Sequence, residues 1–238
     1  MIKILCIYPD DGSTRFLNRV QNHLKQNLTE SFHCYKIKPD QVSHDNCLER
    51  LQKVTEEEFV IFLGHGRSDC LFGANSNCGF LVSPFFEGIS NYENDNFIHR
   101  ENISVFSGKK VFCLSCNSAD GLGKLAVQKG AKAFIGFGDI PTDNEVLAEV
   151  GKRLAFLIAR LKGEINWIVK KSLVYSINNN HNFFQLVDTV RLFTNFRINE
   201  IILTHRSLRQ RRLLADYLYN FKNDMALFGD GNERLLSE

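Results

Sequence analysis

Two side chains suited to covalent catalysis each follow an apolar stretch of this chain. His65 follows EEFVIFLG, and Cys116 follows KKVFCLS. A free thiol has a pKa of about 8.5 and becomes an effective nucleophile when a neighbouring imidazole takes its proton. We therefore expect His65 and Cys116 to act as a cysteine-nucleophile dyad.

Two neighbouring parallel strands must position this dyad. Both apolar stretches are typical of buried strands, and chemistry in an open parallel sheet takes place beyond the carboxyl ends of the strands. Gly66 offers a backbone N–H that, with the N–H of Cys116, can form an oxyanion hole. A helix beginning near Asp120 would favour the Cys116 thiolate through its dipole.

The cysteines and the histidine of these segments also permit roles other than catalysis. Cys113 lies within the strand and should face away from Cys116. The CLSC spacing permits a zinc site completed by Cys70, Cys78 or His65, but a pair that straddles a strand end is poorly shaped for one. Taken singly, the histidine and the cysteine would be ordinary core residues, so their joint position carries the catalytic prediction.

These segments resemble a known family. FVIFLGHG and VFCLSCNSA are similar to the signatures of the caspase-like cysteine proteases, in which one hydrophobic strand ends in His-Gly and a later one in Cys. Ala119 and Gly231 depart from the family's usual Gly and Pro, and neither departure removes a catalytic group. Three further segments resemble CHAT, gingipain and separase-type domains: GLGKLAVQKGAKAFIGF, KGEINWIVKKSL and MALFGDGNERL.

The resemblance implies endopeptidase activity by the histidine and the cysteine. In separase-like and gingipain-like members an acid after the nucleophile strand receives a basic P1 side chain. Asp139 and Asp143 are the candidates here, and Asp139 is the better one, because Asp143 is equally typical of an ordinary first-turn acid of a helix. Arg67 would instead serve a preference for Asp at P1.

Composition limits the partners and the location. The formal net charge of the 238 residues is +2, so neither nucleic acid nor an anionic membrane is expected as a partner. The segment LAFLIARLKGEINWIV carries three charged residues, too many for a membrane span. Seven cysteines without an export signal indicate a reducing cytoplasm. No linker divides 1–238, so we expect one domain, with no metal or cofactor.

Apolar stretches alternate with amphipathic ones along the chain. This order predicts an α/β fold, specifically a caspase-like three-layer sandwich with a mostly parallel six-stranded sheet and helices on both faces. The expected strands cover 2–8, 32–38 at an edge, the two stretches before His65 and Cys116, 131–138 and 225–230.

The helical stretches have identifiable boundaries. Ser13 or Thr14 is the candidate N-cap of the first helix, and Asp40 that of the second. Gly130 stands where a helix ends with a positive φ. The remaining helices are expected from a Thr142 and Glu145 capping box to Lys162 and Gly163, from about Glu164, and over 183–221 with Ser207 as a cap.

Residues 67–107 lose this periodicity. Because a stretch of that length in a compact domain is usually a functional loop, we expect a substrate-facing insert directly after His65. The insert carries apolar side chains too hydrophobic to stay solvated: Phe72, Phe80, Leu81, Phe85 and Phe86.

These features predict a cysteine endopeptidase that cleaves a protein substrate after a basic residue. We expect a regulatory protein partner or ligand to activate it by ordering its loops, and the resemblance implies a role in prokaryotic antiviral defence. The alternative is a non-catalytic module of the same fold that binds partner proteins. Replacing Cys116 by Ala discriminates between the two.

Overall fold

The computed structural model describes residues 3–12, 14–28, 32–53, 58–75, 96–141, 151–204 and 210–236. Within these ranges six strands form one mostly parallel sheet: β1 (Ile4–Pro9), β2 (Phe32–Ile37), β3 (Phe59–Leu63), β6 (Lys110–Leu114), β7 (Ala133–Gly136) and β8 (Ala226–Gly229). Their order is β2-β1-β3-β6-β7-β8, and β8 alone among them runs antiparallel to its neighbour. The predicted α/β fold is confirmed.

The strands match the burial that their sequences predict. Every residue of β3 and β6 is buried, because these runs, apolar except for Lys110, lie in the middle of a sheet covered on both faces. Strand β2 is buried at its two ends and more exposed between them, and it lies at one edge of the sheet, as predicted. Strand β8 closes the other edge.

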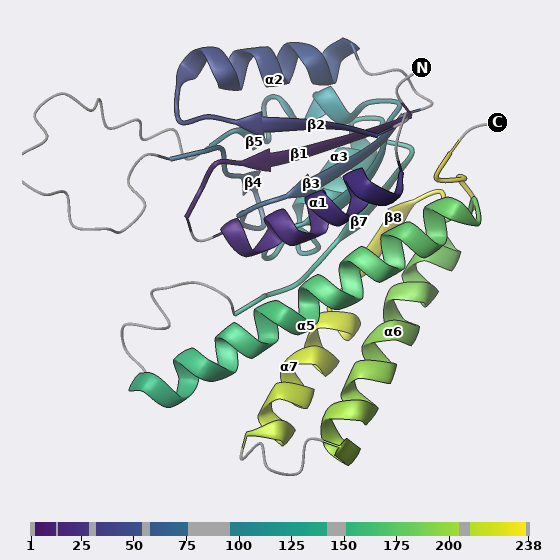
Figure 1. Cartoon of the computed structure of the whole chain (residues 1–238). Coiled ribbons are helices and arrows are strands. Elements are labelled where there is room, and N and C mark those ends of the chain that lie inside the picture. The colour runs from purple at the N-terminus through teal and green to yellow at the C-terminus, as the bar shows by residue number, and fades with distance from the viewer. Residues whose placement is uncertain are drawn as a thin grey trace, which may run out of the picture.

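Helices cover both faces of the sheet (Figure 1). One apolar core lies between the sheet and η1 (Arg15–Leu17), α1 (Asn18–Asn27), α5 (Gly151–Asn178), α6 (Phe183–Thr204) and α7 (Arg211–Asn223). The second core lies between the opposite face and α2 (Gln41–Lys53), η3 (Ile103–Phe106) and α3 (Leu122–Gln128). The sheet therefore separates two apolar cores, and we name them the α5 core and the α2 core.

The predicted cap of α2 and the predicted end of α3 agree with the structure, and the start of the first helix differs. Asp40 caps α2, because its Oδ1 accepts a hydrogen bond from the Ser43 N–H at 2.7 Å. Gly130 has a φ of 101° after α3. Thr14 makes no side-chain cap, and the chain turns through η1 before α1 begins. Ser13 lies outside the described residues.

The predicted break at Gly163 is wrong, because α5 continues through it. A glycine in a helix interior costs about 1 kcal/mol relative to alanine. The apolar stripe Leu161, Ile165 and Ile168 is buried on the α5 core and outweighs this cost. No helix within the described ranges is long and apolar enough to cross a membrane. Thr142, Glu145 and Ser207, the other predicted caps, lie outside those ranges.

Within the interval 67–107, the described residues 67–75 and 96–107 have more regular structure than predicted. Its described parts form a small antiparallel pair, β4 (Cys70–Leu71) with β5 (Ile98–His99), followed by η3. Phe97 and Phe106 are buried in the α2 core, which explains why an aperiodic sequence is so apolar. Phe72 is half-buried, and the other four apolar residues named for this insert lie outside the described residues.

The burial of β3 can be tested by truncation. Phe59 is fully buried and packs edge-on against Phe183 of α6, with ring centroids 5.7 Å apart. Phe59→Ala should lower the free energy of unfolding by about 3–5 kcal/mol, measured by urea denaturation. Phe156→Ala, at a residue 61% exposed on α5, should change it by less than about 0.5 kcal/mol. Equal effects would contradict the central position of β3.

Candidate active site

The register between β3 and β6 places the two predicted catalytic residues. Leu63 pairs with Leu114, and the Gly64 N–H donates to the Leu114 carbonyl at 3.2 Å. Counting two residues onward from the Leu63–Leu114 pair reaches His65 on one chain segment and Cys116 on the other. Parallel pairing therefore delivers both side chains to the same edge of the sheet.

His65 and Cys116 line one pocket, whose empty space including its mouth is about 310 Å³. The pocket lies on the α5 side of the sheet. Its remaining wall is largely apolar and comes from η1, α5 and the segment after β7, through Phe16, Leu17, Ile140 and Ile165. Such a wall excludes water from the sulfur and leaves a polar edge at the imidazole.

The structure adds a third residue, Asp11, that sequence reasoning missed. Its Oδ2 lies 3.6 Å from Nε2 of His65, and both side chains are largely buried, 14% and 19% exposed respectively. Asp11 follows β1, the neighbour of β3, so three adjacent parallel strands end in Asp11, His65 and Cys116. The available signal was the acidic pair that directly follows the first apolar strand.

The loop that carries Asp11 is tied to the edge strand. The Asp10 N–H donates to the Ile37 carbonyl at 2.7 Å, and the Asp10 carboxylate pairs with the Lys36 ammonium at 2.7 Å. On its other side, the Thr14 hydroxyl donates to the Asp11 carbonyl at 3.4 Å. These contacts fix the backbone that presents the Asp11 carboxylate to the imidazole.

A tight hairpin holds the backbone of His65. Its carbonyl accepts a hydrogen bond from the Phe72 N–H at 3.0 Å, and the Arg67 N–H donates to the Cys70 carbonyl at 2.8 Å. The Arg67 side chain is 57% exposed and lies near Asp69 and over the Phe72 ring. The structure therefore does not bring Arg67 to the pocket lining.

Gly66 packs directly on the end of β6. A Cβ at this position would lie 2.1 Å from the Ser115 Oγ and 2.9 Å from the Cys70 carbonyl oxygen. Glycine is therefore required for β3 and β6 to approach this closely beyond their paired residues. The oxyanion role of the Gly66 and Cys116 amides stays a prediction.

The turn after the nucleophile candidate has a distinctive backbone. Cys116 is partly buried, and its thiol donates to the Ile140 carbonyl at 3.4 Å. Asn117 has a φ of 55°, in the left-handed region that asparagine tolerates better than most residues, and its N–H donates to Gly138 at 2.9 Å. The chain therefore turns away from the direction of β6 at the residue after Cys116.

Ser118 fastens this turn to the sheet. Its hydroxyl donates to the Ser115 carbonyl at 2.8 Å and accepts a hydrogen bond from the Phe137 N–H at 3.0 Å. A Cβ on Gly136 would lie 2.8 Å from the Ala119 nitrogen, so β7 must carry glycine there. The segment that holds Cys116 is thus packed against β7 without intervening side chains.

Helix α3 begins later than predicted. It starts at Leu122 with Gly121 as N-cap, and the turn of residues 116–121 separates it from Cys116. Because the effect of a helix dipole falls off within the first turn, the predicted help to a Cys116 thiolate loses its basis. His65 lines the same pocket as Cys116, and the Asp11 carboxylate lies beside His65.

Cys113 faces away from Cys116, as predicted. Its side chain is buried in the α2 core, whereas Cys116 packs against the α5 core. Burial raises the pKa of the Cys113 thiol to about 12. Of this pair, only Cys116 lies on the pocket.

Of the two predicted P1-binding acids, Asp139 is the one within the described residues, and it does not line the pocket. Asp139 is exposed after β7, and the next residue, Ile140, lines the pocket in its place. Asp143 lies outside the described residues.

The described residues offer no cluster of side chains suited to binding a metal ion. No group of three or more His, Cys, Asp or Glu side chains there is arranged to hold a metal ion. Cys70, one residue of the zinc alternative, is buried, and its sulfur accepts a contact from the Arg67 guanidinium at 3.6 Å. Cys78 lies outside the described residues.

No protein-family model, curated protein or solved structure matches this chain. The structure itself sets the class: an α/β protein with a mostly parallel six-stranded sheet and helices packed on it. At the carboxyl edge of that sheet, a carboxylate, an imidazole and a thiol follow three adjacent strands.

The close approach at Gly66 gives a test of the site's architecture. Gly66→Ala should lower the free energy of unfolding by about 1–3 kcal/mol, because the methyl group must displace the end of β6. Gly163→Ala is the matched control, since an added Cβ meets no atom within 4 Å. It should raise stability by about 0.5–1 kcal/mol. Thermal denaturation of both variants measures the difference, and a stabilised Gly66→Ala would refute the packing described.

Proposed function

We propose that this chain is a cysteine endopeptidase of the caspase-like type, in which His65 and Cys116 form the catalytic dyad. The observation that carries the proposal is that both side chains line one pocket, at the ends of paired parallel strands. The resemblance of FVIFLGHG and VFCLSCNSA to that family supports the same assignment.

The proposed reaction begins with transfer of the Cys116 thiol proton to His65. This requires the S–H bond to rotate away from the Ile140 carbonyl, its acceptor in the resting structure. The thiolate then attacks the scissile carbonyl, and the imidazolium returns the proton to the leaving amine as the acyl-enzyme forms. Water, deprotonated by His65, releases the acid and regenerates the thiol.

Asp11 acts as the positioning residue in this scheme. Its carboxylate lies beside Nε2 of His65, so it holds the ring orientation and stabilises the imidazolium that each proton transfer produces. The amides of Gly66 and Cys116 are proposed to bind the oxyanion. Glycine at 66 leaves that N–H uncrowded by a side chain of its own.

The proposed substrate is a protein cut after a basic residue. Asp139 at the exposed end of β7, or Asp143 beyond it, would pair with the P1 cation, and Arg67 would serve the opposite preference. A protein partner or ligand is proposed to control the reaction by ordering the loops around the pocket. We place this activity in prokaryotic antiviral defence on the family resemblance alone.

Replacing either member of the dyad tests the activity. Cys116→Ala and His65→Ala should each lower kcat/KM for peptide hydrolysis by about 10⁴-fold or more, since each removes an obligatory participant. Cys34→Ser, at a thiol remote from the pocket, is the control and should retain activity. A chain whose cellular effect survives Cys116→Ala is a binding module instead.

Peptidyl acyloxymethyl ketones give the same test without a known substrate. Probes with Arg or Asp at P1 are incubated with the chain, and the alkylated residue is mapped by mass spectrometry. Cys116 should be labelled and Cys113 spared, with the Arg probe reacting faster. Faster reaction of the Asp probe would reverse the P1 assignment. Equal labelling rates for all peptide sequences would contradict a substrate-binding site beside Cys116. Constitutive cleavage by the isolated chain would exclude the proposed gating.

Asp11→Asn tests the third residue. It keeps the shape of the side chain but removes the charge beside His65, so kcat should fall by about 10²-fold with little change in KM. Lys36→Met is the matched control, because it removes the charge that pairs with Asp10, the residue before Asp11, and leaves the contact between Asp11 and His65 in place. If Asp11→Asn raises KM at constant kcat, the carboxylate binds substrate and does not position the histidine.

A further inference from the structure

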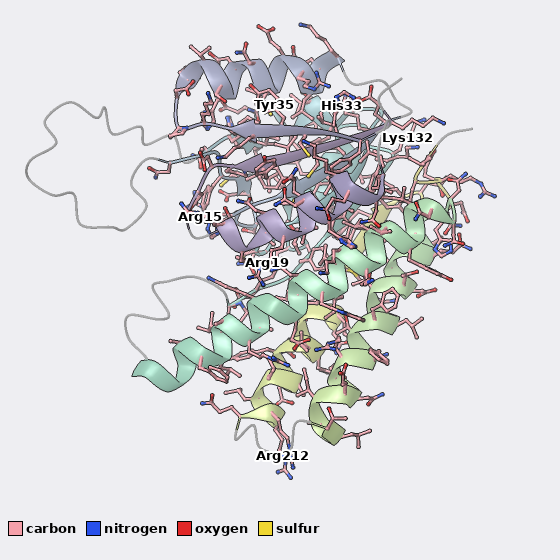
Figure 2. The ribbon with its side chains drawn as sticks, in the orientation of Figure 1. Arg15, Arg19, His33, Tyr35, Lys132 and Arg212 are labelled. Carbon is pink, nitrogen blue, oxygen red and sulfur yellow. The ribbon has the colours of Figure 1, made fainter. Side chains whose placement is uncertain are left out.

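A second cysteine, remote from the pocket, lies in an environment built for reactivity. Cys34 belongs to the edge strand β2, between His33 and Tyr35. Figure 2 shows these two neighbours on the side of β2 that faces α2, and the Tyr35 hydroxyl donates to the Ser43 carbonyl there at 3.0 Å. By strand alternation Cys34 lies on the opposite face, where it packs half-buried at the border of the α5 core.

A dedicated donor meets the Cys34 sulfur. Gln21 of α1 is buried at 6% exposure, and its Nε2 donates to the Cys34 Sγ at 3.0 Å. A hydrogen bond from a buried amide is stronger to a charged sulfur than to a neutral one, so this geometry favours a sulfur that carries negative charge. Lys25, one turn further along α1, adds a positive charge on the same side.

The register supplies a second thiol. Cys6 of β1 is the direct partner of Cys34 across the parallel pair, and the two thiols share a side-chain hydrogen bond. Neighbouring strands lie about 4.7–4.9 Å apart, inside the Cα separation of about 4.4–6.8 Å that a disulfide requires. Cys6 is fully buried, whereas Cys34 is partly exposed.

The two thiols differ in acidity in a way that fits separate roles. The hydrogen bond from Cys6, reinforced by Gln21, lowers the pKa of the Cys34 thiol to about 7. Burial raises the pKa of Cys6. Burial also raises the pKa of the Cys47 thiol to about 12, which makes Cys47 an unreactive reference.

We propose that Cys34 is a peroxide-reactive thiol and that Cys6 is its resolving partner, so that hydroperoxides convert the pair into a reversible disulfide between β1 and β2. The assignment rests on the Gln21 donor, the exposure of Cys34 at the sheet edge and its register with Cys6.

The chemistry balances in two steps. The Cys34 thiolate attacks a hydroperoxide oxygen, giving a sulfenic acid on Cys34 and releasing hydroxide or alkoxide as the O–O bond breaks. The Cys6 sulfur then attacks the sulfenic sulfur, the S–S bond forms, and water leaves with the Cys6 proton. Two electrons pass from the pair of thiols to the peroxide. A thiol reductant restores both cysteines by exchange.

Peptide mapping of the whole chain tests this directly. The chain is treated at pH 7 with a small excess of hydrogen peroxide, blocked with N-ethylmaleimide and digested with trypsin without reduction. Trypsin places Cys6 in residues 4–15 and Cys34 in residues 26–36, so a cross-link joins two distinct peptides. The Cys6–Cys34 linkage should form and should disappear after dithiothreitol.

Variants separate the two steps. Cys6→Ser should accumulate a sulfenic acid on Cys34 that dimedone traps, and Cys34→Ser should give neither adduct nor linkage. Gln21→Leu should slow iodoacetamide alkylation of Cys34 by about two- to tenfold, because it removes one hydrogen bond to the thiolate. Gln26→Leu, at an exposed position of the same helix, should leave that rate unchanged.

The pH profile gives a further readout. Alkylation of Cys34 should rise through about pH 7, whereas Cys47 stays unlabelled in the folded chain. Lys25 on α1 and Cys6 and Tyr8 on β1 are the other titratable groups that act with Cys34, and burial raises the pKa of Tyr8. Alkylation of Cys34 no faster than that of Cys47, or oxidation that spares Cys34 while modifying Cys116, would overturn the proposal.

Discussion

The pairing of β3 with β6 is the constraint on which the rest of this structure depends. Its register, fixed by Leu63 opposite Leu114, determines which residues emerge together at the carboxyl edge of the sheet. A slip of one residue would turn Cys116 to the opposite face and bring Cys113 to the α5 side. Gly66, which admits the close contact with Ser115, and the Ser118 hydrogen bonds to β7 both serve to hold this one register beyond the paired residues.

The described cysteines differ in thiol pKa because they lie in different environments of the fold. Those enclosed in hydrocarbon, such as Cys47 and Cys113, have a raised pKa and remain thiols. Cys34 has the opposite environment, because an amide donor and a neighbouring thiol stabilise its charged form. Cys116 owes its place to a strand end, where an imidazole and a carboxylate lie within one loop cluster. The position of each cysteine in the fold thus determines how acidic its thiol is.

Local sequence predicted the sheet and the positions of His65 and Cys116 just beyond two strand ends, because buried parallel strands are continuous apolar runs. Asp11 escaped prediction, since its role depends on β1 lying beside β3, which is a matter of strand order. Asp139 is exposed and does not line the pocket, because the turn of the chain after β7 sets its exposure, and local sequence does not give that turn. Its P1 role stays a prediction. The break expected at Gly163 failed for another reason: tertiary packing of α5 outweighs the low helix propensity of one glycine.

The division of the interior into two apolar cores has a practical side. The pocket is lined from η1 and α5, on the side of the α5 core. Helix α2 covers the other face of the sheet (Figure 1). A fluorophore or affinity handle attached to an outward position of α2, such as Val42 or Glu49, is thus screened from the sulfur and the imidazole by the whole thickness of the sheet. The fold offers a built-in attachment surface for reporters that leaves the chemistry undisturbed.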